Sequence, residues 1–260
     1  WKKVPSFSDK IFSSFDLNLA SSLETKRYLE DLNAKNVYYT GNIKLIGNND
    51  TNLNENINQK FLKKKYIWLA ASTHNGEEIL CIKTHIELKK KIGQIVTIIA
   101  PRHIRRVEYI KKLCDKNKLS SQILSKDDLI NENKEIILIN SFGSLPSFFK
   151  HIKSVFIGKS TLKKMESVGG QNPIEAVKLG CKVYHGPYVY NFKEIYQIFN
   201  KNNISKEISN EHELAENLIL DFKIDPKDIN RYSKVMADME GKTLNDTMSK
   251  INNFLSNENL

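Results

Sequence analysis

Cysteine, arginine and long apolar runs are all scarce in this chain of 260 residues. The three cysteines lie far apart without a CxxC pair, and the histidines do not cluster, which argues against a disulfide framework or a metal site. No apolar run approaches the roughly 18 residues that a membrane-spanning helix needs. The longest runs, such as residues 95–100, have the length of a strand. We therefore expect a reducing compartment and no spanning segment.

The charge balance is strongly basic, with 40 lysines and arginines against 30 aspartates and glutamates. The net charge of +10 is compatible with acidic partners such as phosphates, nucleic acid or anionic lipid. A hydrophobic fraction of 40% excludes a wholly disordered chain. We interpret most lysines as a solvated surface. The few arginines are the more informative cations: Arg27, Arg102, Arg105, Arg106 and Arg231.

The first 45 residues predict an incomplete piece of a larger sheet. Residues 15–20 and 37–40 have the pattern of strands, and residues 23–32 have the pattern of a helix between them. The chain begins with Trp1 instead of methionine, so we expect further residues before it. Residues 47–58 are polar and rich in asparagine, which indicates a linker, and we place a domain boundary there.

After this linker, short apolar strands alternate with helices. We expect strands at residues 66–70, 94–100, 122–124, 135–140, 154–158 and 182–185, and helices at residues 76–91, 102–117, 172–179 and 192–200. This alternation is typical of an α/β fold with a doubly wound, mostly parallel sheet. From residue 211 the pattern is helical, with a second helix after Pro226 and a third over residues 243–255.

Ligands of such sheets bind beyond the carboxyl ends of the strands, so the loops there form the candidate site. The first loop, residues 71–78, leads from a strand into a helix N-terminus and suits an anion such as phosphate. The alternative is a capped helix with Glu77 and Glu78 in its first turn. The candidate caps are Ser72, Thr73 and Asn75.

The second loop, residues 101–106, holds three of the five arginines, and arginine suits bidentate recognition of phosphate. The third, residues 140–145, is a glycine turn that leads into a helix and allows close approach of the backbone. In the fourth, residues 169–176, paired glycines free the backbone and indicate a ligand, and Asn172, a candidate cap, follows them. Glu175 there fits either a capping box or a contact to a ribose diol.

No CxxC, HExxH, Walker A, GxSxG or GxGxxG pattern occurs, which argues against a dinucleotide dehydrogenase. Five motifs, in their order along the chain, resemble those of the 3-deoxy-D-manno-octulosonic acid (Kdo) transferases. They are STHNGEE at 72–78, PRH at 101–103, FGSL at 142–145, GGQNPIEA at 169–176 and HGPYVYNF at 185–192. FDLNLASS and YYTGNIKL, nearer the start of the chain, match as well. The resemblance covers about residues 15–199.

Those enzymes transfer Kdo, with inversion, from CMP-Kdo to a lipid A precursor in bacterial lipopolysaccharide synthesis. The resemblance implies the GT-B architecture of two Rossmann-like domains. Residues 1–45 would then end the acceptor-side domain, residues 46–225 would form the CMP-sugar-binding domain, and residues 226–260 would be C-terminal helices. It further implies no cofactor beyond the donor substrate, and a place at the cytoplasmic face of the inner membrane, which the full-length protein would contact.

By the same resemblance, nine residues fall where the family contacts CMP: Pro101, Arg102, Phe142, Gly143, Ser144, Asn172, Pro173, Ile174 and Glu175. Five more are expected to support the site: Ser72, Thr73, His74, Gly169 and Gly170. Ser144 stands where members usually carry glutamate, and Gln171 replaces a common histidine. The family's catalytic base belongs to the acceptor-side domain, so no residue here is assigned that role.

Two other functions stay open. One is another GT-B nucleotide-sugar transferase or an epimerase, which a preference for uridine over cytidine nucleotides would reveal. The other is a basic nucleic-acid-binding module. We do not favour it, because aromatic residues are not interleaved with the basic clusters.

Overall fold

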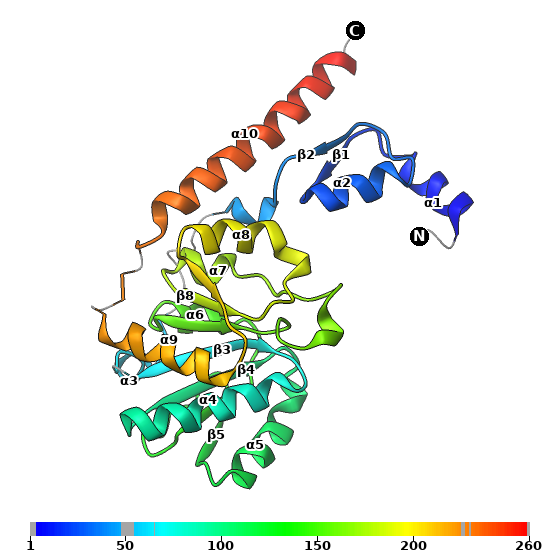
Figure 1. The fold of residues 1–260 in the computed structure, drawn as a ribbon. Helices are drawn as coiled ribbons and strands as arrows, with labels where there is room; N and C mark the ends of the chain where they lie inside the picture. The colour runs from blue at the N-terminus through cyan, green and yellow to red at the C-terminus, as the bar shows by residue number, and fades with distance from the viewer. Residues whose placement is uncertain (1–3, 48–54, 65, 225–226, 229, 259–260) are drawn as a thin grey trace. The chain divides into compact units, whose positions relative to one another are not determined.

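The computed structural model describes residues 4–47, 55–64, 66–224, 227–228 and 230–258. The chain divides into two compact units, one of residues 1–48 with 233–260 and the other of residues 49–232 (Figure 1). Most of the expected linker, residues 48–54, lies outside the described residues. The two units are treated separately below.

The first unit contains the expected strand, helix and strand. Its elements are α1 (Pro5–Phe12), β1 (Asn18–Ala20), α2 (Leu23–Glu30), β2 (Val37–Tyr39), the 3-10 helix η1 (Ile43–Leu45) and α10 (Ser233–Glu258). β1 and β2 pair in parallel. The hydroxyl of Ser22 accepts a hydrogen bond from the N–H of Thr25, which explains why α2 begins at Leu23.

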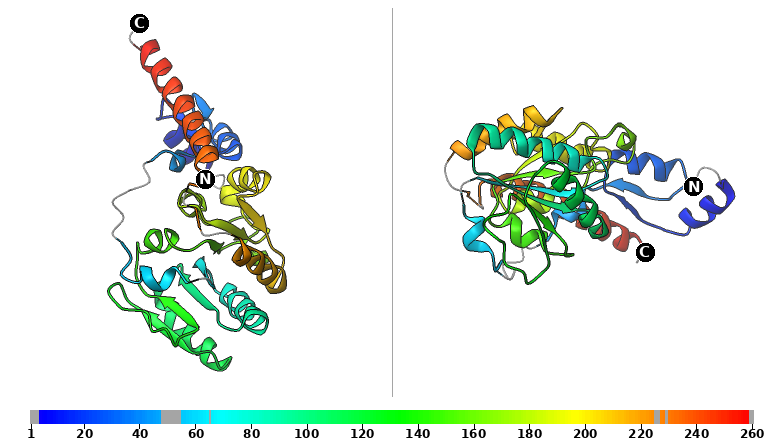
Figure 2. Two further views of the ribbon diagram at one scale, coloured as in Figure 1. Left: turned by 90° about the vertical axis from the view of Figure 1, so that its left-hand side faces the viewer. Right: turned by 90° about the horizontal axis from the view of Figure 1, so that it is seen from below.

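Helix α10 differs from the prediction of two separate C-terminal helices. It is one helix of 26 residues that continues through Gly241 (Figure 2). It belongs with the first unit because it packs on η1, and because Glu240 accepts a hydrogen bond from the N–H of Gly47. The ammonium of Lys250 also lies 4.5 Å from the ring centre of Tyr38. Residues 233–260 are therefore grouped with residues 1–48, whereas the sequence had suggested a separate tail.

The second unit is built on a parallel sheet of seven strands. The strands are β3 (Ile67–Thr73), β4 (Val96–Pro101), β5 (Ser121–Leu124), β6 (Ile136–Ile139), β7 (Ser154–Ile157), β8 (Lys182–His185) and β9 (Ser205–Glu207), in the order β5-β6-β4-β3-β7-β8-β9. The prediction missed β9, because two of its three residues are exposed and polar and show no apolar pattern.

Helices connect these strands. They are α3 (Gln59–Leu62), α4 (Glu77–Ile92), α5 (Val107–Lys116), α6 (Leu145–Phe149), α7 (Ile174–Lys178), α8 (Lys193–Lys201) and α9 (Glu211–Lys223), with 3-10 turns η2 (Ile104–Arg106), η3 (Lys163–Met165) and η4 (Tyr190–Phe192). The helix expected from residue 102 starts later, at Val107. Within the described ranges, no helix has both the length and the apolar content needed to cross a membrane.

The sheet is buried on both faces. Trp68 and Phe156 pack into a core that α4 and α9 share, and those two helices lie side by side (Figure 1). Their chain neighbours Leu69 and Val155 are fully buried as well and, because side chains alternate along a strand, point to the opposite face. Burial on both faces of an all-parallel sheet confirms the predicted doubly wound α/β class.

The strand order places a topological switch point between β3 and β7. From β3 the chain builds one side of the sheet through β4, β5 and β6, and then crosses to the other side at β7. Loops at the carboxyl ends of β3 and β7 therefore lead to opposite sides, which opens the place where doubly wound proteins bind ligands.

Candidate functional site

Three of the predicted loops meet at the carboxyl edge of the sheet. They follow β3, β4 and β6, which run parallel and lie next to one another. The N–H of Arg102 donates to the carbonyl of Thr73 over 3.0 Å, which fixes the second loop against the first. The rings of His74 and His103 lie edge to face, with their centres 6.1 Å apart. The first two loops are therefore in contact, and the strand order places the third at the same edge of the sheet.

Glu77 joins the loops at the switch point. Its Oε2 accepts hydrogen bonds from the N–H groups of His74 (2.8 Å) and Lys159 (2.6 Å). Its Oε1 accepts from the N–H groups of Ser160 and Thr161 and from the Thr161 hydroxyl. The side chain is fully buried, so one carboxylate holds the loop after β3 against the loop after β7.

Glu77 and Glu78 lie in the first turn of α4 as expected, but the expected cap residues were wrong. The N-cap residue of α4 is Gly76, which has a φ of +107° and no side-chain hydrogen bond. The expected caps Ser72, Thr73 and Asn75 therefore do not cap this helix. Ser72 has φ of +55° beside an irregularity in the β3–β4 pairing. Local spacing suggested a helix start, but the buried acids serve contacts with distant loops.

Gly158 allows the close approach that Glu77 needs. A Cβ atom at this position would lie 2.6 Å from the carbonyl oxygen of Ser72 and 2.8 Å from Oε2 of Glu77. Distances below 3.0 Å are not tolerated, so a larger residue would separate the two loops. Sequence reasoning missed both Gly158 and Glu77 as organising residues, since they are 81 positions apart in the chain.

The arginines of the second loop divide into two groups. Arg106 pairs with the buried Glu78, with 2.9 Å between Nη2 and Oε2, and this carboxylate also accepts hydrogen bonds from Thr73 and Gly76. Arg102 and Arg105 are exposed at the carboxyl edge, with no acidic partner within the described residues. The cluster of three is therefore not a single phosphate clamp. Arg102 and Arg105 are the cations that can reach a ligand.

The third loop presents backbone and an aromatic ring to solvent. Phe142 is 75% exposed, an unusual state for a phenylalanine, and Gly143 has φ of +72°. Ser144 lies at the start of α6, and its hydroxyl accepts a hydrogen bond from the Ser141 hydroxyl over 2.9 Å. The loop can therefore stack the Phe142 ring on a base and offer N–H groups from the glycine turn.

The paired glycines of the fourth loop have a structural explanation. A Cβ atom on Gly169 would lie 2.2 Å from the carbonyl oxygen of Tyr188. Gly170 has φ of +86°, and its N–H donates to the carbonyl of Lys159. We had expected a ligand to require this pair. Instead, close packing against residues 188–189 and Lys159 requires it.

The start of α7 follows the fourth loop. The side-chain oxygen of Asn172 accepts a hydrogen bond from the N–H of Ile174 over 3.0 Å, while Pro173 takes the cap position and Ile174 is buried. Asn172 thus supports the helix start, one residue away from the predicted place. Glu175 is exposed, with no partner among the described residues, and partial desolvation raises the pKa of its carboxyl.

The carboxyl edge therefore combines exposed cations with neutral donors. Burial lowers the pKa of His74, whose Nδ1 lies 3.1 Å from the Ser72 carbonyl, so its ring is neutral at pH 7. Within the part of the chain that the structure describes, no group of three His, Cys, Asp or Glu side chains comes together to hold a metal ion. Arg102, Phe142 and Glu175 are exposed, and by their chemistry they can pair with an anion, stack on a ring and accept hydrogen bonds, respectively.

The chain is similar in sequence to several curated proteins. No protein-family model matches the chain. A 3-deoxy-D-manno-octulosonic acid transferase from Haemophilus influenzae is 33% identical over 166 residues, which are 61% of this chain and 37% of that protein. One from Aquifex aeolicus is 27% identical over 214 residues, 82% of this chain and 56% of that protein. The chain thus spans about half the length, or less, of the curated relatives that it matches.

The fold has a solved counterpart. The C-terminal CMP-Kdo binding domain of WaaA from Acinetobacter baumannii matches 73% of this chain and 92% of its own length, with a TM-score of 0.56 and 19% identity. This likeness concerns the fold, and it confirms the Rossmann-like sheet of the GT-B class for the second unit. In sequence, the chain is similar to the 3-deoxy-D-manno-octulosonic acid transferases over part of their length, and in fold it is similar to a CMP-Kdo binding domain.

Proposed function

We propose that this chain is the donor-binding part of a Kdo transferase and that its second unit binds CMP-Kdo at the carboxyl edge of the sheet. The observation that supports this most directly is the placement of the matched motifs. The loops with Ser72, Arg102 and Gly143 follow adjacent parallel strands and lie at one edge. A nucleotide bound there would be within reach of the exposed Arg102 and Phe142.

Each of the main contacts has a physical rationale. Arg102 is exposed and unpaired within the described residues, so its guanidinium is available for the CMP phosphate. Glu175 is likewise free to accept hydrogen bonds from a ribose diol. Ser144, which replaces the family's usual glutamate, leaves backbone contacts as the main contribution of its loop.

In the whole protein, we propose transfer of Kdo, with inversion, to a lipid A precursor at the cytoplasmic face of the inner membrane. That step needs a general base near the acceptor hydroxyl and an acceptor held in line. We assign neither the general base nor the positioning of the acceptor to a residue of this chain. Residues 1–260 alone should bind CMP and transfer no Kdo, and transfer should appear when an acceptor-side domain is supplied in cis.

Calorimetric titration with CMP, CMP-Kdo and UMP tests the donor proposal. We expect CMP to bind more tightly than UMP, and Arg102→Ala to weaken CMP binding about tenfold or more, because a charge-assisted hydrogen bond contributes about 1.5–3 kcal/mol. Lys164→Ala, an exposed cation outside the matched motifs, is the control and should bind CMP normally. Tighter binding of UMP would favour another GT-B transferase or an epimerase. Equal CMP affinity in Arg102→Ala would remove the second loop from the site.

A further inference from the structure

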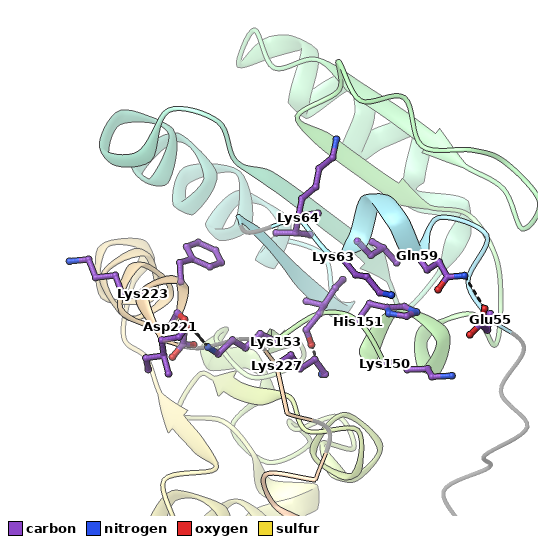
Figure 3. Close-up of a pocket in the computed structure, with 15 residues that line it drawn as sticks. Glu55, Gln59, Lys63, Lys64, Lys150, His151, Lys153, Asp221, Lys223 and Lys227 are labelled. Carbon is purple, nitrogen blue, oxygen red and sulfur yellow. Dashed lines mark hydrogen bonds between the residues drawn. The ribbon is translucent and has the colours of Figure 1, made fainter.

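A cavity lies at the edge of the sheet opposite the candidate donor site. Its volume is about 850 Å³. It opens beside Ile67 at the start of β3 and Lys153 just before β7, and is therefore at the amino ends of the strands (Figure 3). α3, the end of α6 and the end of α9 complete its wall. None of the matched motifs contributes to it.

Lysine dominates the lining of this cavity. Six lysines line it: Lys63, Lys64, Lys150, Lys153, Lys223 and Lys227. The lining also contains two acidic residues, Asp221 and Glu55. Asp221 is buried and accepts hydrogen bonds from the hydroxyls of Ser154 (2.7 Å) and Tyr184 (2.6 Å). Glu55 accepts a hydrogen bond from Gln59.

Two of these lysines, Lys153 and Lys227, bind the carbonyls at helix ends. Lys153 donates to the carbonyls of Asp221 and Ile224 at the end of α9, and Lys227 donates to those of Phe149 and Ile152 at the end of α6. These contacts satisfy the last carbonyls of two helices.

The neighbouring pair Lys63 and Lys64 differ in their contacts. Lys64 is part of the lining, but its ammonium pairs with Glu132 and points away from Lys63 and His151. Lys63 and Lys150 have no acidic partner within the described residues. In Figure 3 the Lys63 side chain lies beside His151. Lys63 and Lys150 are therefore at the end of the cavity formed by α3 and α6, whereas Lys223, which also has no acidic partner within the described residues, is at the end of α9.

His151 adds an unpartnered ring nitrogen beside these cations. Its Nε2 is buried and has no hydrogen-bond partner among the described atoms. Burial and the charges of Lys63, Lys150 and Lys227, opposed by Glu55, lower the pKa of its ring, so the imidazole is neutral at pH 7. A buried polar atom without a partner is costly, and the tautomer with the proton on Nε2 has an N–H there that can donate to a phosphate oxygen.

We propose that this cavity binds a phosphate-bearing ligand, with the phosphate held between Lys63 and His151. Lys150 and Lys227 add positive potential, and the side chain of Lys63 is free to move onto the phosphate and open the way to His151. A cavity of this size falls within the range of about 300–1,000 Å³ that holds a small organic molecule. It therefore has room for the body of an ester as well as for its phosphate. The ligand is either a soluble phosphate ester or the headgroup of an anionic lipid.

Binding of two probes tests the proposal. Glycerol 3-phosphate is titrated by calorimetry, and co-sedimentation is measured with vesicles of phosphatidylcholine containing one fifth phosphatidic acid, against phosphatidylcholine alone. Saturable binding of glycerol 3-phosphate identifies a soluble ester, and binding only to the acidic vesicles identifies a lipid headgroup. If neither probe binds, the proposal is wrong.

Substitutions of Lys63, Lys64 and His151 test whether the probe binds in this cavity. Lys63→Glu should weaken binding of the active probe about tenfold or more, and Lys64→Glu, the adjacent lysine that points away, should leave it within twofold. Thermal unfolding checks that both variants fold, and His151→Asn gives a second variant that keeps the charge unchanged. A bound phosphate should also raise the pKa of His151, measured by NMR titration. Equal loss in Lys63→Glu and Lys64→Glu would reduce the effect to general surface charge and overturn the assignment.

Discussion

The buried carboxylate of Glu77 provides the sharpest test of how the loops at the carboxyl edge are held together. Glu77→Gln keeps the shape of the side chain but replaces one oxygen with an NH₂ group. Oε1 accepts three hydrogen bonds and Oε2 accepts two. Whichever oxygen is replaced, at least two donors of the loops after β3 and β7 then face another donor.

The size of the effect follows from this count. Each buried donor left without an acceptor costs about 1–3 kcal/mol. Two such donors predict a loss of roughly 2–6 kcal/mol in the free energy of unfolding. In a domain of about 150–250 residues, 1 kcal/mol lowers the Tm by about 2–4 °C. We therefore expect Glu77→Gln to lower the Tm by about 4 °C or more, and to weaken CMP binding as the two loops separate.

Urea unfolding and scanning calorimetry measure this change. The matched control is Glu175→Gln, the same substitution at an exposed carboxylate with no partner among the described residues. That control should stay within about 0.5 kcal/mol of the parent. If Glu77→Gln is as stable as Glu175→Gln, the carboxylate does not hold the loops and the described network is wrong.

Three further predictions concern an ion pair, two glycines and a buried histidine. Arg106→Ala should lower the free energy of unfolding by about 3 kcal/mol, because it leaves a buried carboxylate unpaired, whereas Arg102→Ala should unfold like the parent in the same urea titration. Gly158→Ala should lower the free energy of unfolding by about 1–3 kcal/mol or more through overpacking. Gly241→Ala, in a helix with open space around it, should raise the free energy of unfolding by about 0.5–1 kcal/mol, and calorimetry measures both changes. Burial lowers the pKa of His85 to about 4, so its neutral form is favoured in the folded state. Stability should then fall by up to about 3 kcal/mol as pH drops from about 6.5 to 4, and His85→Gln should flatten that dependence in unfolding measured across this range.

The central strands could be predicted because their residues are apolar on both faces. Ile136–Ile139 and Ser154–Ile157 are fully buried, and such short apolar runs between helices indicate a parallel sheet. The edge strand β9 could not be predicted, because an exposed strand shows no apolar pattern. The break expected near Gly241 was wrong, since one glycine costs a helix only about 1 kcal/mol and tertiary contacts outweigh that.

The candidate site was predictable only in part. Strand-end loops with glycine and arginine mark the carboxyl edge of a parallel sheet, and the positions of Ser72, Arg102 and Gly143 follow from that rule. The nine residues expected to contact CMP stay predictions that binding experiments must test. The paired glycines Gly169 and Gly170 show the limit of such reasoning, because a glycine indicates that something approaches closely and does not identify it.

Arg102 and Arg106 show why roles within one loop cannot be separated by residue type alone. Both are arginines four positions apart, and both lie beside a helix start. The difference comes from Glu78, a residue 28 positions before Arg106, which is buried in the first turn of α4 and needs a cation to balance its charge. Arg106 supplies that cation, so Arg102 and Arg105 are left exposed at the edge of the sheet. Which arginine faces a ligand is therefore decided by a partner on another element, and only the folded chain brings the two together.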